Sequence, residues 1–480
     1  MSTSTKLKKV FYGNIIYSNS PTDLVVLSPG CIGIDHTGTI AFLVSDKDAD
    51  LVKLKAQYHF TDAQVTTMTK EQFLIPGFID THIHAPQYVF TGTGYDLPLL
   101  QWLEKYTFPR EAAFKDEDYA RAAYIRCVAR TLRCGTTTAC YYATIHVPGC
   151  KILTDIVHQI GQRAFIGKVN MDRNSPDNYR ETTGDSIEAT TEFVSWLLER
   201  KDPLITPVIT PRFAPSCTGD LMKFLGEISA KHNLPIQTHL SENTAEIKWV
   251  LDLHPEFSSY TGVYEGFGLL NSRSVLAHCV YLTPEEKVLI KSVEAGISHC
   301  PNSNFLLQSG VLNVRQLLEA EIKVGLGTDV AGGYSPSILD SIRNAVIASK
   351  VIFVNTRAAK EEAEAAGLPP VRAYEPLTLA EVFYLGTLGG AEVMNLDDKI
   401  GNFSVGKDFD ALLVDLNASG STKASNLVDG NKSVDLFPHD DLISAFEKFV
   451  YNGDDRNLIE IYVKGKQVSG SAGIITKIAV

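Results

Sequence analysis

The chain has 480 residues, of which 44% are hydrophobic and 21% are charged. This length exceeds what one hydrophobic core commonly supports, so two domains are expected, one of them large. The net charge of −12 argues against a nucleic-acid backbone or an anionic membrane as the main partner, because like charges repel.

The start of the chain and its cysteines are typical of a cytoplasmic protein. Residues 1–20 lack the apolar core of a signal peptide, and no apolar stretch is long enough to cross a bilayer. The eight cysteines contain no C-x-x-C pair and lie mostly in apolar segments, as reduced and buried thiols do. We therefore expect a cytoplasmic protein that binds neither membranes nor nucleic acids.

Strand-like segments occur near both ends of the chain. Residues 10–72 contain short β-rich runs separated by Gly, Ser, Thr and Asp, and two further runs, DALLVDL and LIEIYVKGKQV, occur near the C-terminus. Because each flank is too small to fold alone, we expect residues 1–72 and 397–480 to form one smaller β-sandwich domain. Residues 417–434 are polar and rich in Gly, Ser and Asn, which predicts a loop.

Between these flanks, residues 73–396 are expected to form the large domain. The intervening segments 118–132, 186–200 and 220–233 show helical spacing of apolar residues. Strands alternating with helices predict an α/β fold, a (β/α)₈ barrel of the TIM type. A doubly wound open sheet is the alternative, but its Gly-rich phosphate-binding turn is missing after the first run. The eight predicted strand runs are 73–84, 136–143, 163–172, 206–214, 236–242, 274–279, 295–301 and 323–330.

Two histidines, His82 and His84, end the first run. Side chains two residues apart in a strand point to the same side, so both imidazoles project together. Taken alone, this pair is more often a coincidence than a metal site, but His239 ends the fifth run and Asp329 the eighth. Such barrels carry their active sites at the C-terminal strand ends. We therefore predict a catalytic zinc ion whose ligands are His82, His84, His239 and Asp329.

Two more histidines, His278 and His299, end the sixth and seventh runs. His278 is expected to act in catalysis by hydrogen-bonding the zinc-bound water, and the alternative is a fifth ligand. For His299, a structural role and a catalytic role are equally supported. A second metal would need a bridging group, often a modified lysine on the fourth strand, and that run has none. We expect one zinc ion per chain.

Glu242 lies three residues after His239. Hydrolysis requires a group that accepts a proton from water and later returns it to the substrate, and a carboxylate beside the metal suits both steps. The alternative is a solvated residue at the start of the following helix, where negative charge complements the helix dipole. We favour the catalytic role.

Longer motifs resemble a known family. PGFIDTHIHAPQY, QTHLSEN, LAHC, ISHCPNSN and GLGTDV resemble the amidohydrolase superfamily, in its single-zinc deaminase branch. More narrowly, DLPLLQWLEKYTFPRE, GQRAFIGKVNMD, ITPRFAPSC and GTDVAGGYS resemble the guanine deaminase family. The resemblance covers nearly the whole chain, except the N-terminal lead, the polar loop and the extreme C-terminus. It implies zinc, a cytosolic homodimer, and hydrolysis of guanine to xanthine and ammonia.

The resemblance also implies where the substrate is held. Gln87 offers an amide to a purine edge, Arg212 a rigid fork of donors, and Phe213 a flat apolar face. The alternatives are an amide facing solvent, an ion pair with a nearby carboxylate, and a core aromatic residue, respectively. The complete predicted set of substrate contacts is His84, Gln87, Arg212, Phe213, His239, Glu242 and Asp329.

The expected mechanism assigns a role to each catalytic residue. Asp329 and His278 orient and deprotonate the zinc-bound water, hydroxide adds to C2 of guanine, and Glu242 protonates N3. Glu242 or His278 then assists the departure of ammonia.

Two other interpretations of the sequence stay open. The first is a related barrel that acts on another ring, such as a chlorohydrolase or an adenine-type deaminase. The second is an inactive barrel that serves as a binding protein.

Overall fold

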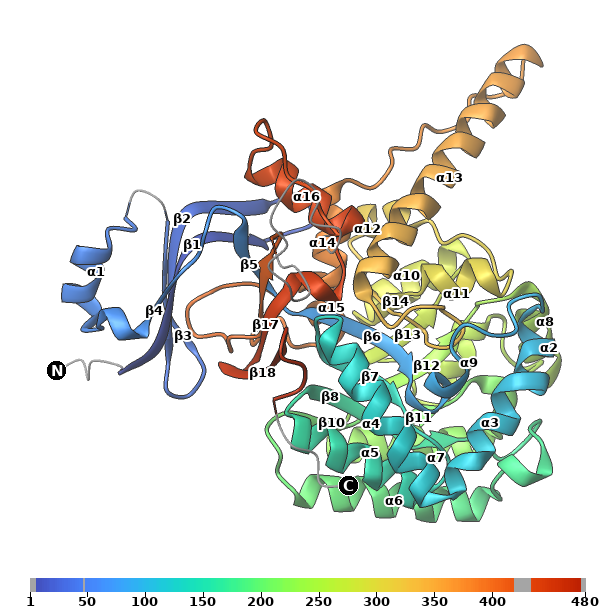
Figure 1. Cartoon of the computed structure of the whole chain (residues 1–480). Helices are drawn as coiled ribbons and strands as arrows, with labels where there is room; N and C mark the ends of the chain where they lie inside the picture. Colours follow the sequence, from blue (N-terminus) through green and yellow to red (C-terminus); the bar gives the residue numbers. More distant parts are fainter. Residues whose placement is uncertain (1–5, 46–47, 418–432, 476–480) are drawn as a thin grey trace.

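The structure is a computed structural model that describes residues 6–45, 48–417 and 433–475. The loop predicted at 417–434 lies outside the described residues except at its two ends. Figure 1 shows a sheet of N- and C-terminal strands beside a larger part formed by the middle of the chain. Helices and parallel strands alternate in this larger part, so the predicted α/β class is confirmed.

The parallel strands of the larger part arise from the eight predicted runs. Their bounds are β6 Phe78–His84, β7 Thr136–Tyr142, β8 Arg163–Gly167, β9 Val169–Asn170, β10 Ile205–Pro207, β11 Thr210–Pro211, β12 Ile236–Leu240, β13 Ser274–His278, β14 Gly296–His299 and β15 Lys323–Leu326. They pair in the orders β10-β8-β7-β6, β11-β9 and β12-β13-β14-β15. The third and fourth runs are therefore each divided into two short strands.

Backbone hydrogen bonds also join these groups to one another. The amide of Gln237 on β12 donates to the carbonyl of Ile209, beside β11, at 2.9 Å. On the other side, the amide of Asp329 donates to the carbonyl of His82 at 2.9 Å, and the amide of His84 donates to the carbonyl of Val330 at 3.1 Å. The chain that follows β15 thus lies directly against β6.

Helices connect the strands and cover them from outside (Figure 1). The three helices predicted at 118–132, 186–200 and 220–233 are confirmed as α4, α6 and α7, with ends shifted by at most three residues. The helix bounds are α1 Leu51–Tyr58, α2 Leu99–Trp102, α3 Phe108–Ala112, α4 Glu117–Arg133, α5 Val147–Ile160, α6 Thr183–Glu199, α7 Gly219–His232, α8 Thr244–Leu253, α9 Tyr260–Gly266, α10 Pro284–Ser292, α11 Pro301–Leu306, α12 Val314–Glu319, α13 Ile338–Ala365, α14 Leu379–Gly386, α15 Leu388–Val393 and α16 Leu442–Asn452.

The two β-rich flanks contribute to one eight-stranded sheet. Its order is β18-β17-β16-β5-β1-β2-β3, and β4 pairs with β1 beside this path. The pairing of β5 with β16 is antiparallel and links the N-terminal flank to the C-terminal one. The bounds are β1 Leu7–Ser18, β2 Leu24–Asp35, β3 Ile40–Val44, β4 Val65–Thr67, β5 Gln72–Pro76, β16 Ala411–Asp415, β17 Leu458–Val463 and β18 Lys466–Gly470.

A single residue, Gly77, separates β5 from β6. The first predicted run, 73–84, is therefore two strands that lie in two different sheets. The amide of Gly77 donates to the carbonyl of Asp410 at 3.0 Å. A Cβ atom added at Gly77 would lie 2.1 Å from the Thr137 hydroxyl oxygen, so only glycine fits this crossing without displacing its neighbour.

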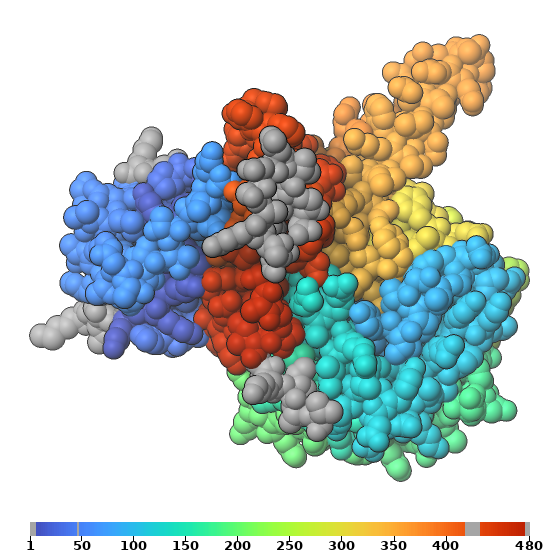
Figure 2. Space-filling view, in the orientation of Figure 1, coloured from blue at the N-terminus to red at the C-terminus, as the bar shows by residue number. Residues whose placement is uncertain are grey.

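Helix α13 extends away from the rest of the molecule (Figures 1 and 2). Ile338 and Ile342 in its first turns are buried, whereas Ile347 and Val354 further along keep 53% and 50% of their surface exposed. Among the described residues, no helix is both long and apolar enough to span a membrane.

Candidate active site

Four side chains from separate strands meet at the C-terminal ends of the parallel strands. His82 lies on β6, His239 on β12, His278 ends β13, and Asp329 follows β15. One nitrogen or oxygen atom from each of them lies within 4.8 Å of the others. Parallel strands bring these residues together because their C-terminal ends share one rim. This cluster is suited to bind a metal ion.

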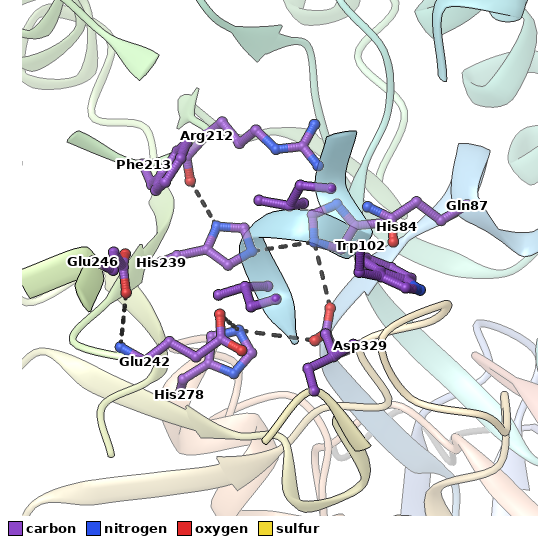
Figure 3. Close-up of a pocket in the computed structure, with 13 residues that line it drawn as sticks. His84, Gln87, Trp102, Arg212, Phe213, His239, Glu242, Glu246, His278 and Asp329 are labelled. Atoms are coloured by element: carbon purple, nitrogen blue, oxygen red, sulfur yellow. Dashed lines mark hydrogen bonds and ion pairs between the residues drawn. The ribbon is translucent and has the colours of Figure 1, made fainter. Parts of the chain in front are cut away.

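His84 lies beside this cluster (Figure 3). Its Nε2 is 3.2 Å from Nε2 of His239 and 3.4 Å from Oδ1 of Asp329. The four-residue cluster thus contains His278 where the predicted ligand set has His84. Five donor side chains converge on one point, and which four of them bind a metal stays a prediction.

The protonation of the histidines fits a cation. Burial lowers the pKa of His82, His84 and His239, so their imidazoles are neutral and carry a free lone pair. Within the described chain, the buried Nε2 atoms of His82 and His278 form no hydrogen bond of regular geometry, although Oδ1 of Asp329 and Oε2 of Glu242 lie 3.2 and 3.5 Å from them. Buried polar atoms left unpaired are costly, and a metal ion at this point would satisfy them.

Neighbouring groups orient two of the imidazoles. His239 donates from Nδ1 to the carbonyl oxygen of Arg212 at 2.6 Å, and His278 donates from Nδ1 to the Asn304 side chain at 2.9 Å. In both rings Nε2 is left to face the cluster. Hydrogen bonds of this kind fix the tautomer and the direction of a metal-binding imidazole.

Asp80 connects the strand of the histidines to the loop that carries Asp329. It is fully buried and accepts hydrogen bonds from the Thr328 hydroxyl at 2.6 Å and the Thr328 amide at 3.0 Å. It also accepts from the amide of His82 at 3.2 Å. Burial raises the pKa of Asp80 to about 7. This carboxyl group holds the β15 loop in register with β6.

Backbone conformations at the cluster are unusual. Ser241, His278 and Asp329 have φ values of 49°, 71° and 46°, in the left-handed region that non-glycine residues seldom adopt. Such residues cluster at functional sites, where the surrounding structure holds the backbone against its local preference. Here the turn at each strand end points a side chain back over the rim.

Glu242 faces the cluster from the side of His278. Its Oε2 lies 3.5 Å from Nε2 of His278, and its Oε1 accepts a hydrogen bond from the Ser309 hydroxyl at 2.7 Å. Burial raises the pKa of Glu242. Burial alone would lower the pKa of His278, but the charges of Glu242 and Asp329 outweigh it and raise that pKa. The two groups can therefore share and exchange a proton.

Glu246 lies beneath Glu242. It accepts from the amides of Glu242 and Asn243 at 3.1 and 3.3 Å, and from the Tyr260 hydroxyl at 2.9 Å. Burial, reinforced by the charge of Glu242, raises the pKa of Glu246 to about 7. These bonds form the cap of α8, whose first turn holds Glu242 over the pocket.

A pocket opens over the cluster (Figure 3). Its lining combines polar and apolar side chains, as expected for a site that binds a small heterocycle. Trp102, Leu99 and Leu103 come from the segment after β6, and Phe213 and Leu307 complete the apolar part of the lining. The lining residues are His84, Gln87, Leu99, Trp102, Leu103, Arg212, Phe213, His239, Glu242, Glu246, His278, Leu307 and Asp329.

Arg212 and Gln87 are both buried and both line the pocket. Arg212 forms the ion pair that was the alternative for it, through Nη1 at 2.6 Å and Nη2 at 3.1 Å. The sequence did not indicate its partner, Glu111. Gln87 donates to the same carboxylate at 2.8 Å and accepts from the amide of Ala331 at 3.1 Å. Neither side chain faces solvent freely.

The remaining predicted candidates divide between pocket and core. Phe213 lines the pocket and meets Trp249 edge-on, with ring centroids 6.0 Å apart. His299 is buried outside the pocket lining, and within the described chain neither of its ring nitrogens has a hydrogen-bond partner. Burial lowers the pKa of His299 to about 3.

Several site residues were not singled out from the sequence. Asp80 carried a usable signal, because it precedes His82 by two residues and shares its strand face. Asn304 and Ser309 lie in the segment after β14 and carry no spacing pattern. Glu111 and Trp102 belong to helices that follow β6, where nothing in the local pattern indicates that they turn towards the pocket.

Comparisons with known proteins agree over most of the chain. The amidohydrolase family profile matches residues 73–468. The guanine deaminase of Dictyostelium discoideum is 48% identical over 98% of this chain and 100% of its own. That of Homo sapiens is 44% identical over 96% and 97%. Among solved structures, the guanine deaminase of C. acetobutylicum with bound guanine in the active site is 35% identical, with a TM-score of 0.81 over 96% of this chain and 99% of that chain.

Proposed function

The chain belongs to the amidohydrolase family, and we propose that it is a guanine deaminase, which hydrolyses guanine to xanthine and ammonia. The observation that carries this function is the pocket in which a metal-binding cluster and Glu242 face the donor side chains of Arg212 and Gln87. This arrangement combines hydrolytic chemistry with groups that recognise a purine edge. The names of full-length relatives point to the same reaction.

The proposed cofactor is one zinc ion per chain, held by His82, His84, His239 and Asp329. Three neutral imidazoles and one carboxylate are a donor set that zinc favours in catalytic sites. When bound by these residues, a zinc ion would lower the pKa of a water molecule next to the substrate. The Nε2 of His82, which forms no regular hydrogen bond, and the low pKa of the imidazoles support this assignment.

The protein groups then move protons in a fixed order. His278 and Asp329 take a proton from the attacking water as its oxygen bonds to C2 of guanine. Glu242 delivers a proton to N3, so that no charge accumulates on the ring. The proton taken from water then passes from His278 to the exocyclic nitrogen, the C2–N bond breaks, and ammonia leaves. Glu242 assists this step by accepting the proton of the C2 hydroxyl as the xanthine carbonyl forms, which restores its starting state. The 3.5 Å separation of Glu242 and His278 supports this exchange.

The proposal extends to the architecture and the assembly. The hydrogen bonds from Gln237 to Ile209 and from His84 to Val330 support closure of the parallel strands into a (β/α)₈ barrel. The shared eight-stranded sheet supports a smaller β domain formed by the two flanks, expected at residues 1–72 and 397–480, beside a barrel expected at residues 73–396. Because β5 lies in this sheet, we move the first boundary to Gly77. We also retain the cytoplasmic homodimer that the sequence suggested. The buried, unpaired cysteines of the described chain agree with a reducing compartment.

The deciding experiment measures ammonia release from guanine by the purified protein, with and without a chelator, alongside elemental analysis. Guanine should be deaminated, activity should fall with loss of zinc, and adenine and chlorinated triazines should release little product. A protein that binds zinc but acts only on another ring would disprove the assignment of substrate. A protein that holds no metal and acts on none of these compounds would instead favour a binding protein.

A further inference from the structure

Glu111 is a buried carboxylate that the proposed mechanism does not use. It lies on α3, and only 1% of its surface is exposed. A buried carboxylate is stable only when its charge and its hydrogen bonds are satisfied. Here both conditions are met by two side chains of the substrate pocket, Arg212 and Gln87. Its partners thus belong to the pocket, although Glu111 itself does not line it.

The contacts of Glu111 fix the direction in which Arg212 points. Nη1 of Arg212 donates to Oε2 at 2.6 Å, and Nη2 donates to Oε1 at 3.1 Å. The ring of Phe108, also on α3, lies 5.3 Å from the guanidinium carbon. A guanidinium has five N–H donors and no acceptor, so those that Glu111 leaves free are donors directed elsewhere. The pair also neutralises the charge of Arg212, which would otherwise be buried alone.

The same carboxylate fixes the orientation of the Gln87 amide. A carboxylate can only accept, so Gln87 must turn its NH₂ group towards Oε1 of Glu111, which it does at 2.8 Å. A backbone amide can only donate, so Oε1 of Gln87 must face Ala331, at 3.1 Å. The amide cannot flip without breaking both contacts. Because the Gln87 oxygen already faces Ala331 and one N–H faces Glu111, the donor that Gln87 has free is its second N–H.

We propose that Glu111 is a positioning residue that sets substrate choice, because it makes both Arg212 and Gln87 present N–H donors to the purine. This inference rests on the proposed guanine deaminase function. A wall of donors favours a purine with acceptors at that edge, such as the O6 keto oxygen. It disfavours adenine, because the amino group at C6 would place its N–H donors opposite those of the protein. 2-Aminopurine has no substituent at C6, so it forms no hydrogen bond there.

The test compares kcat/KM for guanine with kcat/KM for 2-aminopurine, which carries the same amino group at C2. Glu111→Gln keeps the size of the side chain but removes its charge and adds a donor that opposes those of Arg212 and Gln87. We expect kcat/KM for guanine to fall by about 100-fold or more and that for 2-aminopurine to fall by less than about 10-fold. A merely structural defect would lower both substrates alike and leave the ratio unchanged.

A matched control comes from a second arginine–glutamate pair. Glu381 accepts from Nη1 and Nη2 of Arg315, away from the pocket. Glu381→Gln breaks a comparable pair and should leave the guanine to 2-aminopurine ratio unchanged. If Glu111→Gln leaves that ratio within about twofold of wild type, the inference is wrong. Wild-type protein that releases no ammonia from guanine would instead refute the proposed function itself.

A double-mutant cycle shows whether Glu111 acts through Arg212. In an Arg212→Ala background, adding Glu111→Gln should change the ratio by less than about threefold, because the main group that Glu111 positions is gone. Changes that multiply independently would contradict the inference. If Glu111→Gln yields no folded protein, Glu111→Asp is measured instead. Its shortened carboxylate cannot reach both partners, so the ratio should still fall, and an unchanged ratio would again overturn the proposal.

Discussion

Nδ1 of His239 lies 2.6 Å from the carbonyl oxygen of Arg212, so one residue serves two functions at the site. The backbone of Arg212 fixes the tautomer of a proposed metal ligand, while its side chain lines the substrate pocket. The two residues lie at the ends of neighbouring strands. A shift of either strand end would therefore disturb metal binding and substrate recognition together.

The first prediction concerns the metal. Replacing His239 or His82 by Ala should remove zinc and activity together. Each supplies a neutral imidazole as a proposed ligand, and a water molecule in its place would bind the metal too weakly to retain it. Elemental analysis and ammonia release measured on the same preparations test this. Two equivalents of zinc in fully active wild-type protein would contradict a site with a single metal.

The second prediction separates proton transfer from metal binding. Glu242→Gln preserves the shape of the side chain and its contact with Ser309 but cannot carry a proton. Turnover of guanine should fall by about 10²-fold or more, the usual scale for loss of a general acid–base group, while zinc content stays near one equivalent. Loss of zinc together with activity would identify Glu242 as a ligand instead.

The third prediction concerns how Arg212 recognises the substrate. Arg212→Ala should lower kcat/KM for guanine, which corresponds to a loss of several kcal/mol of transition-state binding. The loss for 2-aminopurine should be smaller, and zinc should be retained. Arg212→Lys should restore little, because an ammonium group cannot form two parallel bonds to Glu111 and still face the pocket. Equal losses on both purines would assign recognition of O6 to another residue.

The fourth prediction is a dependence of stability on pH. Burial and the nearby charge of Glu242 raise the pKa of Glu246 from 4.5 to about 7. Between these two values the folded protein keeps a proton that the unfolded chain has released, so the free energy of unfolding falls as pH rises through this window. Glu246→Gln removes this contribution, which is about 3 kcal/mol across the window.

Denaturant unfolding of wild type and Glu246→Gln at several pH values, with zinc content matched, measures the difference. The free energy of unfolding of the variant should increase relative to that of wild type as pH rises from about 4.5 to about 7. Above this range the difference between the two proteins should stay constant. Parallel curves over this range would show that the Glu246 carboxyl group is not protonated in the folded protein at these pH values.

The sequence was sufficient to find those site residues that have a metal-binding or acidic side chain and lie near the end of a predicted strand. His82 and His84 share a strand face, and His239, His278 and Asp329 each lie towards the end of a β-rich run, so a common rim was predictable. The structure brings these residues together. His278 is a member of the four-residue cluster, although it was expected to bind the metal-bound water and not the metal.

Contacts between distant segments were not predictable. Glu111 reaches Arg212 across 101 positions, and no local pattern records such a contact. The strand boundary at Gly77 was missed for a different reason. The chain is hydrophobic and strand-like on both sides of Pro76 and Gly77, so hydrophobic periodicity alone does not separate the two strands, and this Pro-Gly pair was the one local sign of a boundary.

The crossing at Gly77 has a mechanical consequence. A linker of one residue has no slack, so β5 and β6 cannot move apart without breaking the bond from Gly77 to Asp410. The strand that carries His82 and His84 is thus anchored directly to the sheet of the chain termini. Unfolding of that sheet would therefore displace the strand of His82 and His84, and the two parts should lose their structure in one cooperative transition.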